Sequence, residues 1–461
     1  MTGFRELGLD SWLVDALGAL AIRQATEVQQ ACIPAILSGR DVIGGAKTGS
    51  GKTAAFALPI LQRLSEDPFG VFAVVLTPTR ELAGQIAEQF VVLGKGVNLR
   101  VSLVIGGVDM MTQALELSRR PHVVVATPGR LADIISSSSD AVHMQHARFL
   151  VLDEADRLLT DPFAPDLAVI MDALPRSRQT LLFTATMTAS ILALRQQRRP
   201  GTECEPFVHV CASDEGTVAA LAQSYVFVPA HVREAYLVHV LAPYAARKAK
   251  ADADESASTE TKSAVIARDR SVIIFVGQCR AAETLRVMLQ ELGFRVAALH
   301  SKMPQPERQR SLGRFRAEAV RILVATDVAS RGLDIPHVDL VVNMHVPRDA
   351  DDYIHRVGRT ARAGRGGRAI TIVSERDVDL VHNIEARIGK QLDLLPTSEQ
   401  KVLAAMGEVL AAKRAASLHL LDTDFGARDR IRQQKRGVEP PASSDSAAIK
   451  KKKKVKGAVI N

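Results

Sequence analysis

The chain has 461 residues, of which 47% are hydrophobic, and its formal net charge is +8. This length is enough for two or three domains, each with a core of its own. No stretch approaches the roughly 18 to 20 uninterrupted apolar residues of a membrane span, and the first residues lack the basic and apolar regions of a secretory signal, so we expect neither a membrane partner nor secretion.

The first domain is predicted to span residues 1–212 and to be α/β. Longer helix-like stretches alternate there with short apolar runs rich in β-branched residues, at 72–76, 123–126, 149–152 and 180–183. This rhythm is typical of a parallel sheet with helices on both faces.

A glycine-rich loop follows the apolar segment 42–45 and ends in Lys52 and Thr53. Glycines let the backbone approach phosphates closely, and the helix that starts near Lys52 offers unpaired N–H groups to them. Lys52 would neutralise charge on the β and γ phosphates, and Thr53 is a candidate Mg²⁺ ligand. The predicted nucleotide-binding residues of the loop are Ala46, Thr48, Gly49, Ser50, Gly51, Lys52 and Thr53.

Two carboxylates follow the apolar run 149–152, about 100 residues after the loop. Asp153 is the candidate for holding Mg²⁺, through water, because this ion keeps much of its hydration shell. Glu154 is the candidate for orienting and deprotonating the attacking water. A strand that ends in such a pair, after a phosphate-binding loop, predicts an ATPase.

A second domain is predicted over residues 217–396, where the same rhythm restarts. Its apolar runs lie at 225–228, 272–276, 296–299, 322–325, 340–342 and 370–373. We therefore expect a second sheet, with a cleft between the two domains. Residues 245–270 almost lack large apolar side chains and are predicted to form a flexible surface insertion.

Three arginines recur at intervals of three in the second domain, at Arg356, Arg359 and Arg362, next to His355. On a helix or tight turn, Arg359 and Arg362 can point the same way and stabilise the charge on a departing γ-phosphate. Because they belong to the other domain, this interpretation requires the two domains to close for catalysis.

The positive charge is concentrated in the C-terminal tail, predicted to span residues 397–461 and to begin with a helical segment at 397–437. Residues 401–461 hold 14 Lys and Arg against 6 Asp and Glu, whereas residues 1–400 are balanced at 45 of each sign. The five lysines at 450–454 can serve as a nuclear-import signal, an arm that attracts RNA, or a solubilising end, and the sequence leaves these three open.

Together these motifs resemble the DEAD-box RNA helicases of superfamily two. Nearly every sequence block of that family occurs in order: Gln29 with upstream Phe4, then 46–53, 78–83, 106–107, 127–130, 153–156, 184–186, 274–275, 326–334 and 355–362. The resemblance implies two tandem RecA-like domains, each a parallel sheet with helices on both faces. It also implies ATP and Mg²⁺ as cofactors and RNA as the partner.

The resemblance assigns further roles. Gln29 would read the adenine edge, Phe4 would stack on the ring and Asp334 would contact the ribose. The residues expected to grip the backbone of one RNA strand are Arg80, Gly107, Thr127, Arg130 and Thr326. Those expected to couple the nucleotide site to the second domain are Asp156, Thr184, Thr186 and His355. Backbone contacts carry little sequence information, so target choice must come from elsewhere.

Within the family, residues 43–49, 65–68 and 182–186 resemble the branch called DEAD-box protein eight. This similarity implies a monomeric helicase of small ribosomal subunit assembly that acts on precursor ribosomal RNA in the nucleolus, together with a protein cofactor of assembly. Two alternatives remain open: an ATP-gated RNA clamp that unwinds little, and a translocating DNA helicase.

Overall fold

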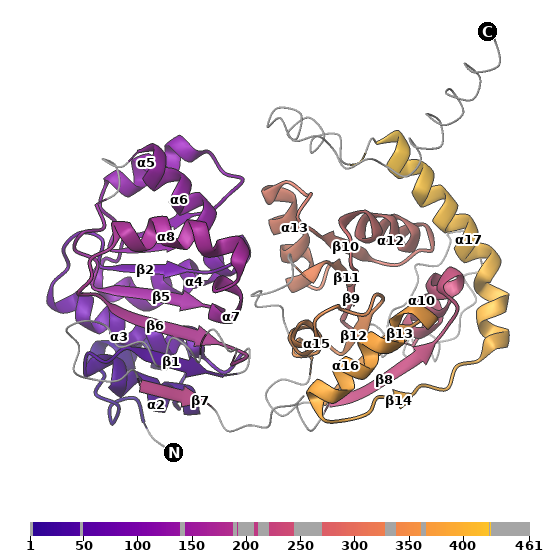
Figure 1. Ribbon diagram of the computed structural model, residues 1–461, viewed down its shortest axis with the longest axis horizontal. Coiled ribbons are helices and arrows are strands. Elements are labelled where there is room, and N and C mark those ends of the chain that lie inside the picture. The colour runs from indigo at the N-terminus through magenta and orange to yellow at the C-terminus, as the bar shows by residue number, and fades with distance from the viewer. Residues whose placement is uncertain are drawn as a thin grey trace, which may run out of the picture.

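The computed structural model describes residues 3–46, 49–138, 143–187, 191, 207–210, 221–243, 270–327, 338–360, 366–423 and 425. Within these ranges the chain forms two seven-stranded sheets, one per domain, and every strand pairing is parallel (Figure 1). The α/β prediction is confirmed. Most of the predicted insertion at 245–270 lies outside the described residues, as do residues 426–461 of the predicted tail.

The first sheet has the strand order β3-β4-β2-β5-β6-β1-β7. Its strands are β1 (Val42–Gly45), β2 (Ala73–Leu76), β3 (Val101–Val104), β4 (Val123–Ala126), β5 (Phe149–Asp153), β6 (Gln179–Thr184) and β7 (Phe207–Val210). Its helices are α1 (Ser11–Ala19), α2 (Glu27–Leu37), α3 (Lys52–Glu66), α4 (Arg80–Leu93), α5 (Met110–Ser118), α6 (Pro128–Ser137), α7 (Ala155–Leu158) and α8 (Ala164–Ala173).

The second sheet has the strand order β10-β11-β9-β12-β13-β8-β14. Its strands are β8 (Leu221–Phe227), β9 (Val272–Phe275), β10 (Val296–Leu299), β11 (Ile322–Ala325), β12 (Leu340–Asn343), β13 (Gly367–Val373) and β14 (Asp393–Leu394). Its helices are α10 (Arg233–Leu241), α12 (Cys279–Glu291), α13 (Gln305–Arg316), α15 (Ala350–Val357), α16 (Val378–Ile388) and α17 (Glu399–Asp422).

The strand sequences are continuously apolar because both faces of each sheet are covered. In β5, Phe149 and Val151 pack into the core beneath α1 to α4, whereas Leu150 and Leu152 point into the core beneath α5 to α8. Successive side chains of a strand face opposite sides, so a strand buried on both faces needs apolar residues at every position. The parallel arrangement also brings the carboxyl ends of the strands to one edge of each sheet, where ligands bind in open α/β sheets.

The tail helix α17 docks on the second domain, along its outer side (Figure 1). It packs against α10 and α12, and Lys413 pairs with Glu234 of α10 at 2.6 Å. The residues that α17 contributes to the core of this domain are Val402, Val409, Ala412, Ala416 and Leu420. The expected helical character is therefore confirmed for residues 399–422, and this part of the tail completes a core. Among the described residues, no helix is long and apolar enough to cross a membrane.

Candidate functional site

The phosphate-binding loop connects β1 to α3 at the carboxyl edge of the first sheet. Gly49 and Gly51 have φ values of 80° and 88°, the left-handed region that glycine adopts without steric cost. A Cβ on Gly51 would also overlap the side-chain amide of Gln29. Ser50 Oγ is buried and has no hydrogen-bond partner in the described part of the chain, and an orphaned hydroxyl of this kind suits a phosphate oxygen. Thr48 lies outside the described residues.

Gln29 braces this loop. Its Oε1 accepts a hydrogen bond from Thr26 N at 3.0 Å, and its Nε2 donates to the Gly51 carbonyl at 3.1 Å. The first contact makes Gln29 part of the capping box of α2, which fixes the side chain against the loop. Phe4, which lies upstream of Gln29 in the chain, is 3% exposed and packs in the core of the first domain. Adenine recognition by these two residues stays a prediction.

Lys52 points back into the loop. Its Nζ donates to the carbonyl oxygens of Ala46 at 2.5 Å and Thr184 at 3.4 Å. Burial lowers the pKa of this ammonium group, and the charge of Arg359 lowers it further, although three nearby carboxylates raise it. Lys52 and Thr53 are the first residues of α3. The N–H groups of the helix N-terminus and the Lys52 ammonium group thus lie together, an arrangement that suits a phosphate.

The two carboxylates at the carboxyl end of β5, Asp153 in its last position and Glu154 directly after it, are both buried. Asp153 is 4% exposed and its Oδ1 accepts a hydrogen bond from Glu154 N at 3.0 Å. Burial raises the pKa of Asp153 to about 7, and the charges of Glu154 and Asp156 add to the rise, while Lys52 opposes it. Glu154 has φ 55°, a left-handed conformation that costs a residue with a side chain about 1–3 kcal/mol. Such strain is concentrated at functional sites, because the surroundings must hold it.

A polar relay leads from these carboxylates to the second domain. Asp156 Oδ2 accepts a hydrogen bond from Thr186 Oγ1 at 2.6 Å and lies 3.4 Å from His355 Nε2 of α15. Thr184 Oγ1 donates to the Thr186 carbonyl at 2.7 Å. Burial alone would raise the pKa of Asp156, but the contacts with His355, Thr186 and Lys52 lower it to about 2. The predicted coupling residues are thus brought into one network.

The three arginines at 356, 359 and 362 differ in their surroundings, and only Arg359 and Arg362 were predicted to act on the γ-phosphate. Arg359 is 2% exposed, and its charge helps to lower the pKa of Lys52 in the phosphate-binding loop. Arg356 is instead engaged inside its own domain: its guanidinium holds both oxygens of Asp327, at 2.5 and 2.7 Å, and packs over the ring of Phe275. Arg362 and Asp334 lie outside the described residues.

The expected RNA-binding residues of the first domain gather where β2, β3 and β4 end. Arg80, the first residue of α4, packs so closely on Gly106 and Gly107 that a Cβ on either glycine would overlap its guanidinium. Arg130 Nη1 donates to the Val108 carbonyl at 2.7 Å. Thr127 precedes α6, and its N–H bonds the carbonyl oxygen of Val104 at 3.0 Å. These four residues therefore lie at the same edge of the first sheet, and their role in RNA binding stays a prediction.

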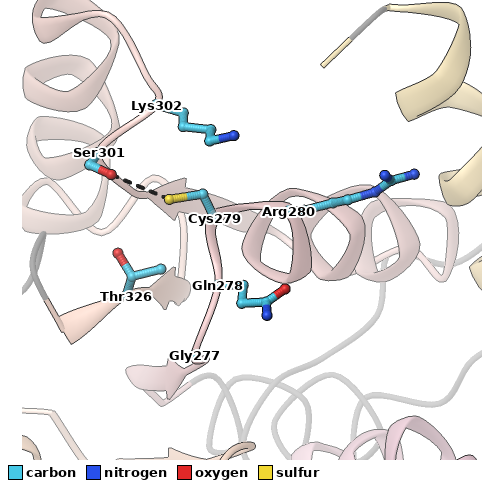
Figure 2. Close-up of a pocket in the computed structure, with 7 residues that line it drawn as sticks. All are labelled: Gly277, Gln278, Cys279, Arg280, Ser301, Lys302 and Thr326. Atoms are coloured by element: carbon cyan, nitrogen blue, oxygen red, sulfur yellow. Dashed lines mark hydrogen bonds between the residues drawn. The ribbon is translucent and has the colours of Figure 1, made fainter. Parts of the chain in front are cut away.

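Thr326 occupies the matching edge of the second sheet, after β11. Its hydroxyl is buried and has no hydrogen-bond partner among the described residues. It lines a pocket of about 340 Å³ (Figure 2), whose wall is formed by Gly277, Gln278, Cys279, Arg280, Ser301, Lys302 and Thr326. Apart from Thr326, none of these residues stood out in the sequence.

The two domains also meet at an interdomain clasp, formed by Glu81, Gln305 and Arg308. Arg308 Nη2 lies 2.8 Å from Glu81 Oε2, with side chains that are 6% and 4% exposed, and Gln305 Nε2 donates to Glu81 Oε1 at 3.2 Å. Glu81 stands next to Arg80 in α4, and its partners begin α13. The sequence carries no signal for this pairing, because the residues are 224 positions or more apart.

Comparison with known families agrees with this geometry. The model of the DEAD/DEAH box helicases matches residues 26–194, and the model of the helicase conserved C-terminal domain matches residues 259–364. The chain belongs to the DEAD-box ATP-dependent RNA helicases. It is therefore an ATPase that binds ATP and RNA, and the predicted family is confirmed.

Relatives and solved structures narrow the assignment. The chain is 52% identical over 460 residues to the ATP-dependent RNA helicase dbp8 of Schizosaccharomyces pombe, covering 98% of this chain and 97% of that one. It is 50% identical to DBP8 of Yarrowia lipolytica, with 97% and 98% covered. These similarities place the chain in the DBP8 group of the family.

Two similar solved structures have a TM-score of 0.73 each. The first is S. cerevisiae Dbp5 bound to RNA and ADP BeF3, at 27% identity, with 89% of this chain and 100% of that chain covered. The second is Mss116p bound to ssRNA and AMP-PNP, at 28% identity, with 92% and 88% covered. The tandem RecA-like fold is thus confirmed.

Proposed function

We propose that this helicase separates short RNA duplexes locally, during precursor ribosomal RNA processing and assembly of the small ribosomal subunit in the nucleolus. The observation that carries the local, closure-driven mechanism is the contact of His355 with Asp156, 3.4 Å apart across the two domains. A reaction centre built from both halves is complete only when they are closed, so ATP turnover and the grip on RNA share one conformational change.

In the nucleotide site, the backbone of the loop and the N-terminus of α3 would cradle the phosphates, with Lys52 on the β and γ groups. Residues that would complete the cradle are Ala46, Thr48, Gly49, Ser50, Gly51 and Thr53. Gln29 and Phe4 would select adenine, and Asp334 would contact the ribose. Because Gln29 already donates to the Gly51 carbonyl, base recognition and loop geometry would be linked.

The donor set fits Mg²⁺. A buried carboxylate whose pKa is raised to about 7 by burial and by two like charges is stabilised when a divalent cation neutralises it. Asp153 would hold the ion through water and Thr53 would ligate it, since Mg²⁺ prefers oxygen ligands and retains several waters. The bound ion would supply charge neutralisation on the β and γ phosphates.

Hydrolysis needs a positioned base and a stabilised leaving group. Glu154 would accept a proton from the attacking water, whose oxygen forms the new bond to the γ-phosphorus while the bond to the bridging oxygen breaks. Arg359, with Arg362, would stabilise the charge that develops on the phosphoryl oxygens. His355 would report the nucleotide state through Asp156, Thr186 and Thr184.

RNA would lie across both domains, on Arg80, Gly107, Thr127 and Arg130 of the first and Thr326 of the second. A strand held by both in the closed state is bent, so a short duplex cannot stay paired, and hydrolysis then reopens the domains. RNA must bind the closed state better than the open one, or it would not shift the equilibrium. The motor need not travel along the strand.

A paired assay tests this function. Strand displacement from a short RNA duplex is measured beside ATP hydrolysis, with matched single-stranded DNA as a second stimulant. We expect RNA-stimulated hydrolysis with displacement. Hydrolysis without displacement would support an ATP-gated clamp, and equal stimulation by DNA would support a DNA helicase.

The cellular part of the proposal rests on the similarity to the DBP8 group and on the lysine run at 450–454. Crosslinking in cells followed by sequencing of the attached RNA should recover precursor ribosomal RNA, together with a protein cofactor of assembly bound to the monomeric helicase. Loss of nucleolar signal in a chain lacking residues 450–454 would identify the run as an import signal. Recovery of messenger RNA alone would contradict the assignment.

A further inference from the structure

The pocket beside Thr326 has the features of a phosphate site. Its wall includes Cys279, the first residue of α12, which brings the N-terminus of that helix to the pocket. Lys302 contributes an ammonium group from the loop after β10, and the buried hydroxyl of Thr326 adds a donor that has no other partner in the described chain. Figure 2 shows Lys302 and Thr326 on opposite sides of Cys279.

The Lys302 side chain is held from outside the pocket by an aromatic ring. Its Nζ lies 5.6 Å from the centre of the Phe425 ring, within the range of a cation–π interaction. On the same ring, His300 packs edge-on, with centroids 5.7 Å apart and planes at 82°. The His300 side chain is 1% exposed, and its Nε2 lies 3.3 Å from Glu283 Oε2 of α12. The imidazole against which Phe425 packs is therefore held in place by α12.

Phe425 owes its position to α17. Its N–H donates a hydrogen bond to the carbonyl oxygen of Leu420 at 3.2 Å, which ties the backbone of Phe425 to the end of the helix. Leu420 is buried in the core that α17 shares with α10 and α12. The end of the tail helix therefore reaches the edge of the pocket as part of the packed domain.

We propose that Phe425 is a positioning residue for RNA binding: it holds the ammonium group of Lys302 at the pocket, where that group meets an RNA phosphate. This inference rests on the proposed function of the Thr326 edge as part of the RNA grip. A long, flexible lysine side chain loses conformational entropy when a ligand orders it. An aromatic ring that already confines the side chain makes this loss on RNA binding smaller. The tail helix thus acts on RNA affinity through one side chain, without touching the nucleotide site.

The test compares full-length variants in two measurements. These are the Kd for a short single-stranded RNA with a non-hydrolysable ATP analogue, and the KM for RNA and the kcat of ATP hydrolysis. The variant Phe425→Leu keeps an apolar side chain but removes the aromatic face. We expect it to raise Kd and KM about three- to fivefold, the range of an exposed cation–π contact, with kcat at saturating RNA retained. Phe425→Tyr, which keeps the face, should restore the affinity.

A double-mutant cycle separates positioning from general damage. Once Lys302→Met has removed the ammonium group, Phe425→Leu should have no further effect. Additive losses, or a parallel fall in RNA-independent hydrolysis, would overturn the inference and give Phe425 a merely structural role. The control Leu421→Ala truncates a side chain that is 62% exposed near the same helix end and should change neither constant.

Different results would refute RNA binding at the Thr326 pocket and the positioning role of Phe425. If Lys302→Met and Thr326→Val leave the Kd for RNA unchanged, the pocket does not hold RNA and the proposed function of this edge is wrong. If both weaken binding while Phe425→Leu does not, the RNA site stands and only the positioning role is refuted.

Discussion

A substitution in the interdomain clasp should change the equilibrium between the open and closed arrangements of the two domains. Arg308 and Glu81 are both almost fully buried when they meet at 2.8 Å, yet they belong to different domains and regain water when these part. Removing one member of a buried ion pair leaves the other charge without compensation, at a cost of about 3–5 kcal/mol. We take the lower end, because the uncompensated charge can escape by opening. Arg308→Met should then shift the closing equilibrium about 100-fold toward the open state.

The assay is RNA binding with a non-hydrolysable ATP analogue, read beside the distance between two dyes, one on each domain. The Kd for RNA should rise by up to about 100-fold with loss of the closed signal, while ATP affinity in the absence of RNA is kept. Adding Glu81→Gln to Arg308→Met removes the orphaned charge and should recover part of the loss. Arg310→Met, on an exposed position of α13, is the matched control. Unchanged closure in Arg308→Met would refute the reasoning.

Three further predictions follow from the nucleotide site and the tail. Glu154→Gln should bind ATP normally but hardly hydrolyse it, so normal steady-state turnover would refute its assignment as the base. Because the folded pKa of Asp153 is raised to about 7 from 3.8, ionising this group destabilises the nucleotide-free protein, and stability should fall as the pH rises from about 4 to 7. In Asp153→Asn this contribution should be absent from thermal melts, and an identical pH profile would contradict the burial argument. Removing residues 438–461 should weaken RNA binding mostly at low salt, and an unchanged salt slope would show that the tail does not touch RNA.

The central strands and the nucleotide loop could be predicted because their signals are local. A strand buried on both faces must be apolar throughout, as β4 and β5 are, and the phosphate loop needs its glycines within a few positions of Lys52. The edge strands β3, β7 and β14 were not predicted, because an edge strand needs no continuous apolar run, and in β7 the polar His209 interrupts it. In β3, alternate residues are only half-buried, and β14 has two residues, both exposed, so neither carries a strong apolar run.

Long-range features left no trace in the sequence. Arg356 and Arg359 are three positions apart and look alike in the chain, but Asp327 and Phe275 engage Arg356, whereas the charge of Arg359 acts on Lys52 of the other domain. The left-handed backbone of Glu154 and the ring of Phe425 beside Lys302 likewise depend on surroundings supplied by distant segments. Such pairings follow from the packing of whole domains, and residue spacing does not encode them.

Catalysis by this helicase requires a reaction centre shared between the two domains, and substitution of Arg359 tests this requirement most directly. Single-turnover hydrolysis at saturating ATP and RNA is measured for Arg359→Lys, which keeps the charge and loses the forked donor. We predict a fall of about 10³-fold, the low end of what an arginine finger contributes, with ATP and RNA still bound. Hydrolysis at the rate of the unmodified protein would contradict the shared centre.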